Sequence, residues 1–433
     1  MCPNPPNSPN PSSNPFRFGA PVRGEDFLDR RRALRRIANT LSQGGSAILS
    51  AEPRMGKTSL LLYLQEQASA LWGHQAERWV FRYLDGHTFG GWDVPRFWRE
   101  ALHPCREVAP AVARAYAQAE AAAFDAQALE GFFQALREAE GRLVLLLDEF
   151  DAAFHEAGLH HQRFYGPLRS LASRCPSLSL VIATRQSVTE MNEATKDFAA
   201  GSPYFNFAQE VALGPFPQRD VDALLAHAGS TFSAEDRAFL RQAAGAHPYL
   251  LQVAAYHLWE AYHPLEGEPL PPPEVRREAA ARELLNQARA TLTDTWRRWT
   301  PAMRLAFAIV ALDHMPRLLP GHDFDLDGSL LRQLTDFQPE LDKLERLGFL
   351  KPDDSMASGY APQAEVMLWH LAEELTQALR GGQDEVARWL IAQEWDGLLK
   401  KGEKEALLRA LKDFGSVVKT LLRLKDLVSL FST

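Results

Sequence analysis

The stretch "AEPRMGKTSLLLYL", residues 51–64, decides the fold because it joins a short apolar strand to an apolar helix. The strand is predicted at 46–50, and Gly56-Lys57-Thr58 stand at the junction. Backbone N–H groups at the opening of a helix point toward an anion, and the helix dipole adds positive potential there. The pattern is typical of a loop that binds phosphates, in which Lys57 reaches the terminal phosphates and Thr58 holds a magnesium ion.

Ala51 stands where such a loop usually has its first glycine. Its methyl group requires an ordinary backbone conformation, whereas glycine would also allow a positive φ. We therefore expect a weakened or slowed site, in which Ala51→Gly raises turnover; the alternative is a chance turn before an apolar helix. The other loop residues expected to bind nucleotide are Pro53, Arg54, Met55, Gly56 and Ser59.

A second motif, "LVLLLDEFD" at 143–151, is an apolar strand that ends in acidic residues. In an open parallel sheet, ligands bind outside the carboxyl ends of the strands. We expect Asp148 to hold magnesium through water and Glu149 to polarise the attacking water. Such a pair could instead cap a helix or a turn, but its place after the Gly-Lys-Thr motif favours the catalytic interpretation.

A third strand, "VIATR" at 181–185, ends in Thr184 and Arg185. A guanidinium there could reach the γ-phosphate and stabilise charge during phosphoryl transfer. The alternative is an ordinary surface arginine after a strand. Arg169 and Arg174 fall on a predicted helix, where solvated charges are the better interpretation.

The order of elements predicts the fold class. Apolar strands alternate with helical stretches up to residue 216, which indicates a parallel sheet covered on both faces. Beyond it the pattern is helical, and "LLRQLTDFQPELDKLERLGFLKPDD" at 330–354 has the helix–turn–helix–hairpin order of a winged helix. We predict an α/β P-loop NTPase sheet with a helical lid domain, followed by an all-α/winged-helix domain and a C-terminal helical tail. The strands are predicted at 46–50, 79–85, 142–151, 178–185 and 209–216.

Composition shifts along the chain suggest the domain boundaries. Pro-, Asn- and Ser-rich segments bury no core and mark tails or linkers. The expected parts are a disordered tail (1–15), a P-loop ATPase domain (16–216), a small helical domain (217–262), a linker (263–275), a winged-helix domain (276–380) and a C-terminal helical tail (384–433).

The overall composition excludes some functions. The 433 residues include 47 basic and 55 acidic side chains, a net charge of −8, which argues against bulk nucleic-acid binding. Three widely spaced cysteines suit neither a disulfide framework nor a zinc cluster. The N-terminus lacks the pattern of a signal peptide and the apolar runs are too short to span a bilayer, so we expect a cytoplasmic location.

With these motifs assembled, the chain resembles STAND-type P-loop ATPases, a signalling branch close to AAA+, and bacterial proteins with an AAA-like or archaeal-type ATPase domain. The resemblance covers about residues 14–262 and extends more loosely through the winged helix. The matching stretches are "NPFRFGAPVRGEDFLDRRRALRRI", "EPRMGKTSLLLYL", "LLLDEFD", "IATR", "VALGPFPQRDVDALL" and "GAHPYLLQVAAYHLWEA".

The resemblance implies further site residues. Gly245 and Pro248 match a Gly-x-x-Pro segment that sets its proline against the bound nucleotide. Phe27, Leu28 and Arg30 would line the adenine pocket, although Asp29-Arg30 replaces the family's frequent Gly-Arg. A histidine of the winged helix often senses the β-phosphate, and the candidates, each better explained as structural, are His314, His322 and His370.

It also implies ATP/ADP and Mg²⁺ as cofactors and a slow ATPase cycle. ADP would hold the domains closed, and ATP would open them for partner binding or self-association through the winged helix and C-terminal helices. The role would lie in bacterial defence or regulated signalling.

Two other functions remain open. A DNA-binding replication or transcription factor would need a basic winged helix, but residues 285–378 hold nine basic and fourteen acidic side chains (9 − 14 = −5). The other is a nucleotide-binding scaffold without turnover, which would bind ATP and release no phosphate, so that Glu149 would have no catalytic role.

The tail is amphipathic and basic, since residues 400–431 hold eight basic and four acidic side chains (8 − 4 = +4). It could meet a partner helix or an anionic membrane, but packing on the chain's own winged helix is favoured. Its apolar positions are Leu407, Leu411, Phe414, Val418, Leu421 and Val428.

Overall fold

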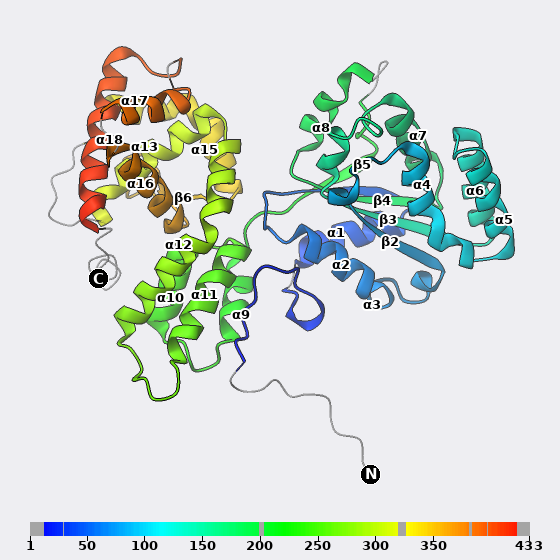
Figure 1. Ribbon diagram of the computed structural model, residues 1–433, viewed down its shortest axis with the longest axis horizontal. Helices are drawn as coiled ribbons and strands as arrows, with labels where there is room; N and C mark the ends of the chain where they lie inside the picture. The colour runs from blue at the N-terminus through cyan, green and yellow to red at the C-terminus, as the bar shows by residue number, and fades with distance from the viewer. Residues whose placement is uncertain are drawn as a thin grey trace, which may run out of the picture. The chain divides into compact units, whose positions relative to one another are not determined.

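The computed structural model describes residues 13–28, 30–198, 203–318, 326–380, 383–395 and 397–421. The chain forms two compact units (Figure 1). One is the continuous stretch Pro21–Leu213, and the other joins the N-terminal residues up to Ala20 to everything from Gly214 onward.

The first unit is built on a five-stranded sheet in the order β2-β3-β4-β1-β5. All four pairings are parallel, which confirms the predicted sheet. The strands are β1 (Ser46–Ser50), β2 (Trp79–Asp85), β3 (Arg142–Asp148), β4 (Leu178–Thr184) and β5 (Ala208–Ala212).

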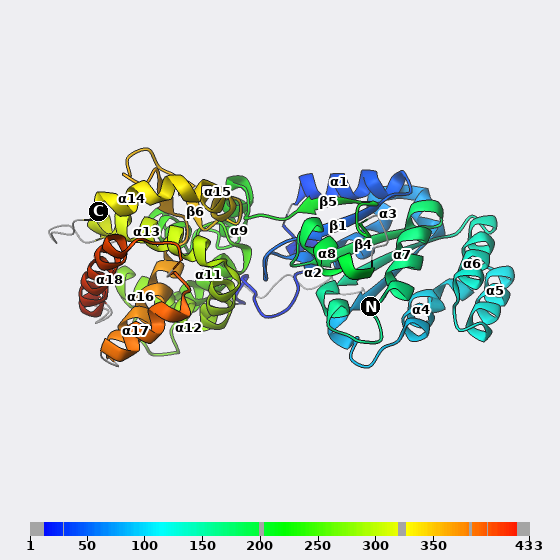
Figure 2. The same ribbon diagram turned by 90° about the horizontal axis from the view of Figure 1, so that it is seen from above.

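Helices cover both faces of this sheet, as Figure 1 shows with α2 and α3 below the strands and α7 above them. Figure 2 looks down on the face that α7 covers. Strands β3 and β4 are buried along their whole length, so alternate residues feed two cores. Val144 and Leu146 join the core under α1, α2 and α3. The helices of this unit are α1 (Arg31–Ser42), α2 (Lys57–Glu66), α3 (Ala68–Trp72), α4 (Val94–Leu102), α5 (Pro110–Ala121), α6 (Ala126–Glu138), α7 (Gln162–Arg174) and α8 (Val188–Ala194).

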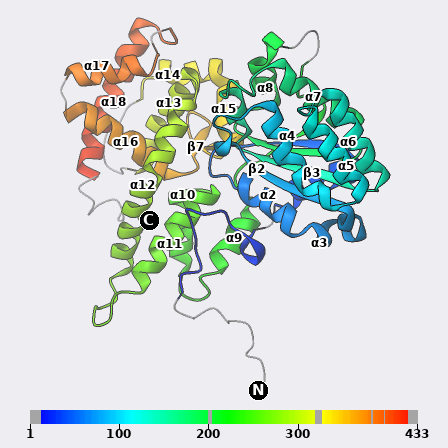
Figure 3. The same ribbon diagram turned by 45° about the vertical axis from the view of Figure 1, so that its right-hand side comes forward.

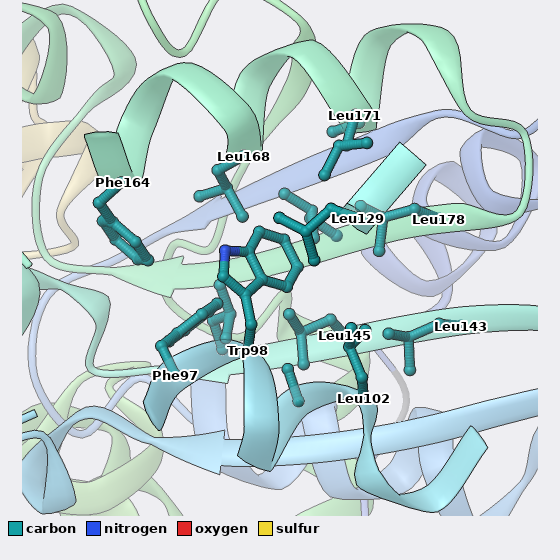
Figure 4. Packing of buried hydrophobic residues seen from close by; sticks show 14 of the residues in the cluster. Phe97, Trp98, Leu102, Leu129, Leu143, Leu145, Phe164, Leu168, Leu171 and Leu178 are labelled. Carbon is teal, nitrogen blue, oxygen red and sulfur yellow. The ribbon is translucent and has the colours of Figure 1, made fainter. Parts of the chain in front are cut away.

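The opposite core is the larger and more aromatic of the two. Trp98 of α4 lies among side chains of α7 and of strand β3, including Leu168 and Leu145 (Figure 4). Phe97 meets Phe164 edge-on, with ring centroids 4.8 Å apart. This packing fixes strand β3, whose end carries the predicted acids.

The second unit is helical. Helices α10, α11 and α12 pack side by side (Figure 3), and a winged helix follows them, with α13, α14, α15 and the antiparallel hairpin β6–β7. The elements are α9 (Gln218–Ala226), α10 (Ala234–Ala244), α11 (Pro248–Tyr262), α12 (Pro273–Arg298), α13 (Pro301–Leu318), α14 (Gly328–Gln333), α15 (Gln338–Arg346), β6 (Leu350–Pro352), β7 (Tyr360–Pro362), α16 (Glu365–Arg380), α17 (Gln383–Ala392) and α18 (Lys401–Leu421).

The segment before Pro21 belongs to this helical unit. Phe16 is fully buried and stacks on Phe232 with ring centroids 5.5 Å apart. The Asn14 side chain donates hydrogen bonds to the Tyr256 carbonyl at 3.1 Å and to Glu260 Oε1 at 2.7 Å. Sequence patterning grouped residues from 16 onward with the sheet domain, whereas the packing groups 13–20 with α11.

Two local expectations also change. Residues 273–275 of the expected linker form the first turn of α12, since proline suits the start of a helix. The helical face expected over 24–41 is a short 3-10 turn at Gly24–Asp26 followed by α1.

The C-terminal helix α18 packs on α16, α13 and α14 of its own unit. Leu407 and Leu411 are buried there, as favoured from the sequence. Residues 422–433, with Val428, and the side chains of Phe414, Val418 and Leu421 lie outside the part of the chain that the structure describes. Among the described residues, no helix is long and apolar enough to cross a membrane.

Candidate functional site

The loop after β1 has the left-handed backbone that a phosphate cradle needs, but not at Ala51. Positive φ angles occur at Arg54 (63°) and Gly56 (90°), and Ala51 has none. Gly56 is the N-cap of α2, and its left-handed conformation is strained for any residue with a side chain. The loop therefore turns at Gly56, and Ala51 only ends the strand.

Lys57 lies under this loop and is almost fully buried. Its Nζ donates hydrogen bonds to the carbonyls of Ala51 at 2.9 Å and Glu52 at 3.2 Å. Burial lowers the pKa of the ammonium, and the nearby negative charge of Glu149 opposes that shift. The ammonium is thus held across the loop, where phosphate oxygens could replace the two carbonyls.

Asp148 is the centre of the hydrogen-bond network at the end of β3. Its Oδ2 accepts from the Thr58 hydroxyl at 2.6 Å and from the Tyr83 phenol at 2.8 Å. Its Oδ1 accepts from the backbone N–H of Glu149 at 3.0 Å. The strand–loop–helix order therefore brings Thr58 and Asp148 together as predicted.

These two oxygen donors fit a magnesium ion, which takes one or two protein ligands and completes its shell with water and phosphate oxygens. Among the described residues, no group of three or more His, Cys, Asp or Glu side chains could hold a metal by itself.

Glu149 is held in an unusual conformation directly after Asp148. Its backbone is left-handed, with φ 44° and ψ 45°. Its Oε2 accepts a hydrogen bond from Arg185 Nε at 3.0 Å. Asp151 accepts from the Thr184 hydroxyl at 2.8 Å and from the Arg185 N–H at 3.0 Å, so the ends of β3 and β4 are bound together.

The segment before α1 runs alongside the phosphate loop. Arg30 donates to the Met55 carbonyl at 2.9 Å, and Phe27 stacks on Tyr63 of α2 with centroids 4.3 Å apart. Ser59 Oγ accepts from the Val22 N–H at 3.0 Å. These contacts place Arg30 at the loop and Phe27 on α2, and their role in a base pocket stays a prediction. Leu28 is half-buried, and Asp29 lies outside the described residues.

Residues 20–267 match a family model described as an AAA-like domain. The chain belongs to this AAA-like family. The match covers more than half of the sequence and includes the loop, both acids and Arg185. Nucleotide binding by a P-loop ATPase domain is therefore a property that the chain shares with this family.

Solved structures that are similar to this chain include archaeal proteins. A Walker-type ATPase of Pyrococcus abyssi is 14% identical with a TM-score of 0.54, covering 82% of this chain and 99% of that one. The ORC2 protein of Aeropyrum pernix in ADPNP–ADP complexes is 14% identical with a TM-score of 0.49, covering 81% and 97%. A STAND protein with a tetratricopeptide sensor from Pyrococcus horikoshii is 14% identical with a TM-score of 0.36, covering 95% and 58%. At this identity, the likeness to the Pyrococcus abyssi ATPase shows the fold alone. A search of curated proteins returned no match.

Pro248 of the AAA-like chain is the first residue of α11 in the helical unit, and its contact with nucleotide stays a prediction. Gly245 has a positive φ of 60°, and a Cβ there would lie 2.8 Å from the Gln363 carbonyl. Packing within the helical unit thus explains this glycine by itself.

Of the histidine candidates, His370 is buried and His314 is half-buried. Burial lowers the pKa of both His314 and His370 to about 4, so both are neutral near pH 7. His322 lies outside the described residues. Arg174 pairs with Glu130 at 2.8 Å on the surface, in agreement with the solvated-charge interpretation.

Sequence reasoning missed Tyr83, Asp151, Tyr63 and Gly86. Asp151 stood inside the quoted acidic motif and could have been found from its spacing. Tyr83 and Gly86 depend on the register between β2 and β3, which the sequence does not show.

Proposed function

We propose that this AAA-like chain is an ATP-binding, slowly hydrolysing switch of the STAND type, whose ADP or ATP state controls partner binding or self-association. The observation that carries the proposal is the ion pair between Glu149 and Arg185. The acid assigned to the attacking water is bound to the arginine assigned to the γ-phosphate. Hydrolysis would then begin only when the γ-phosphate binds Arg185 and so breaks the ion pair that holds Glu149.

The other residues bind and orient the nucleotide. The N–H groups at the start of α2 would face the phosphates, and Lys57 would exchange the carbonyls of Ala51 and Glu52 for phosphate oxygens. Thr58 and Asp148 would hold Mg²⁺, which when bound neutralises phosphate charge. Phe27 and Tyr63 would offer an aromatic face to the base.

Replacing Glu149 by Gln tests the hydrolytic part. The amide keeps a hydrogen-bond acceptor but is no base, so phosphate release should fall on the order of 100-fold while ATP binding is kept. Fluorescent-nucleotide titration and a phosphate-release assay measure the two effects. Glu77→Gln is a suitable control because Glu77 is exposed and its carboxylate lies 2.8 Å from Nδ1 of the exposed His74.

The scaffold alternative predicts a different result for the wild type. A chain that binds ATP but releases no phosphate would be a nucleotide-dependent scaffold without turnover. The switch itself is tested by measuring mass and shape with ADP and with a non-hydrolysable ATP analogue, and identical values in both states would contradict it.

Charge argues against the DNA-binding alternative. Residues 285–378 carry a net charge of −5 (9 − 14). On α15, the recognition-helix position, Glu340, Asp342 and Glu345 outnumber Lys343 and Arg346. Such a helix repels a phosphate backbone, so a protein partner is the better proposal. A salt-dependent mobility shift on duplex DNA at micromolar protein would overturn this choice.

A further inference from the structure

We propose that the end of strand β2 positions both acids of the site: Tyr83 fixes the carboxylate of Asp148, and Gly86 makes room for the left-handed Glu149. The geometry stands by itself, and its catalytic meaning rests on the proposed function. Neither residue is a catalytic residue, because each acts through an acid on the neighbouring strand.

The register of the sheet brings Tyr83 to Asp148. Strands β2 and β3 are parallel, with Asp85 opposite Asp148 and Tyr83 opposite Leu146. From there the phenol reaches forward and donates to Asp148 Oδ2 at 2.8 Å.

The carboxylate of Asp148 is consequently fixed at both oxygens. Thr58 and Tyr83 both donate to Oδ2, and the Glu149 N–H donates to Oδ1. Groups that orient a metal-binding carboxylate in this way commonly control metal affinity, since an unfixed ligand must be ordered when the metal binds. Tyr83 should therefore set the Mg²⁺ requirement of nucleotide binding.

Gly86 is needed for a separate reason, which is space. A Cβ at this position would lie 2.1 Å from the Glu149 carbonyl oxygen and 2.9 Å from that of Asp148. No side chain fits so close to rigid backbone. The carbonyl of Glu149 thus packs on Gly86, and this contact helps to hold the glutamate in its unfavourable left-handed conformation.

The neighbouring Gly90 supplies the contrast. A Cβ there would meet nothing within 4 Å, and its φ lies outside the left-handed region. Gly90→Ala is therefore a matched control for Gly86→Ala. For Tyr83→Phe the control is Tyr116→Phe, which removes a phenol that donates to the Arg99 carbonyl at 3.4 Å in the same unit.

The first experiment measures binding of a fluorescent, non-hydrolysable ATP analogue to the full chain as Mg²⁺ is titrated. For Tyr83→Phe and Gly86→Ala, we expect the half-maximal Mg²⁺ concentration to rise on the order of 10-fold. Binding in EDTA should not change, and the two controls should match the wild type. An unchanged or lowered Mg²⁺ requirement in Tyr83→Phe or in Gly86→Ala would overturn the role of the residue that was replaced.

The second experiment measures phosphate release. Gly86→Ala should lower it to the level of Glu149→Gln, and the double variant should be no slower than Glu149→Gln alone, because both changes act on one group. A further loss in the double variant, or wild-type release in Gly86→Ala, would overturn the role of Gly86.

The two failures can be told apart. A wild type that binds nucleotide without releasing phosphate removes turnover from the proposed function, while the Mg²⁺ titration still decides the roles of Tyr83 and Gly86. Wild-type behaviour of both variants overturns the inference alone. A wild type that binds no nucleotide overturns both.

Discussion

Ala51 is buried at the exit of β1, and its N–H continues the sheet by donating to the Thr184 carbonyl at 3.2 Å. Its methyl group belongs to the core under α1 and α2. Since its φ is not positive, the backbone there does not need glycine. The conformational freedom of the loop lies instead at Arg54 and Gly56, which is why a loop with alanine at its start can keep its shape.

Ala51→Gly is therefore expected to lower stability by about 1 kcal/mol, through the lost methyl contact and greater freedom of the unfolded chain. Steady-state ATPase turnover should stay within about twofold of the wild type, because the residue contacts phosphate through no side-chain atom. Faster turnover at equal stability would instead support the sequence-based expectation that Ala51 slows the site.

Among the site residues, those in contiguous motifs could be predicted from the sequence. Asp148 ends an apolar strand and Glu149 follows it, Lys57 and Thr58 follow the loop after another, and the carboxyl ends of parallel strands meet at one edge. Tyr83 could not be predicted, because its role depends on which strand lies beside β3. The sequence also does not show that Glu149 and Arg185 bind each other.

At the scale of elements, the start of α16 is a buried joint with α10. Glu365 is almost fully buried, and its Oε1 accepts a hydrogen bond from Gln242 of α10 at 2.8 Å. Burial raises the pKa of Glu365 to about 7, while Gln242 and the charge of Lys351 oppose the shift. The folded chain therefore binds a proton that the unfolded chain has lost between its ordinary pKa near 4.5 and pH 7.

The proton bound by Glu365 makes the stability of the folded chain depend on pH, and Glu365→Gln should remove this contribution to the pH dependence. The contribution of Glu365 to stability is complete below pH 4.5, falls as the pH rises, and amounts to a loss of about 3 kcal/mol above pH 7. The variant should consequently melt at a higher temperature than the wild type at pH 8 and lose this advantage at pH 5. Thermal unfolding at four pH values measures it.

The variant must be compared with the wild type because His314 and His370 change stability with pH in the opposite direction to Glu365. Their pKa values are lowered in the folded chain, so the stability they allow is present above about pH 6.5 and falls as pH falls toward 4. The difference in melting temperature between Glu365→Gln and the wild type at each pH therefore gives the contribution of the Glu365 carboxyl alone. A difference that does not change with pH would contradict the assignment.

The strands were the elements predicted best. Residues 46–50 and 79–85 are strands as predicted, because apolar runs of this length between turn signals fit a buried sheet. The predicted strand over 142–151 stops at Asp148, since Glu149 leaves the extended conformation. A positive φ at a glutamate carries no sequence signal.

At the scale of the whole molecule, the chain passes between the two units twice, at Ala20–Pro21 and at Leu213–Gly214. Composition could not reveal the first passage, because residues 13–20 have no hydrophobic periodicity of their own. Their place is decided by single aromatic contacts, of which the stacking of Phe16 on Phe232 is the most buried.

Phe16→Ala should therefore destabilise the helical unit, by about 3 kcal/mol for a fully buried ring. Calorimetry with and without ATP distinguishes the units, because nucleotide should raise only the transition of residues 21–213. The variant should lower the other transition, and Phe18→Ala, which removes a half-buried ring, should lower it less. A shift of the nucleotide-sensitive transition would contradict the grouping of Phe16 with α11.

The strand order has a consequence for biosynthesis. Strand β1 lies between β4 and β5; β4 is complete only when Thr184 has been made, and β5 only when Ala212 has been made. Pairing over such sequence distances is slow, and an unpaired apolar strand is prone to aggregation. During synthesis on the ribosome, β1 and the phosphate loop after it therefore cannot reach their final structure until nearly half of the protein has been made. One edge of β1 ("SAILS") stays unpaired until β4 emerges, and the other until β5 emerges.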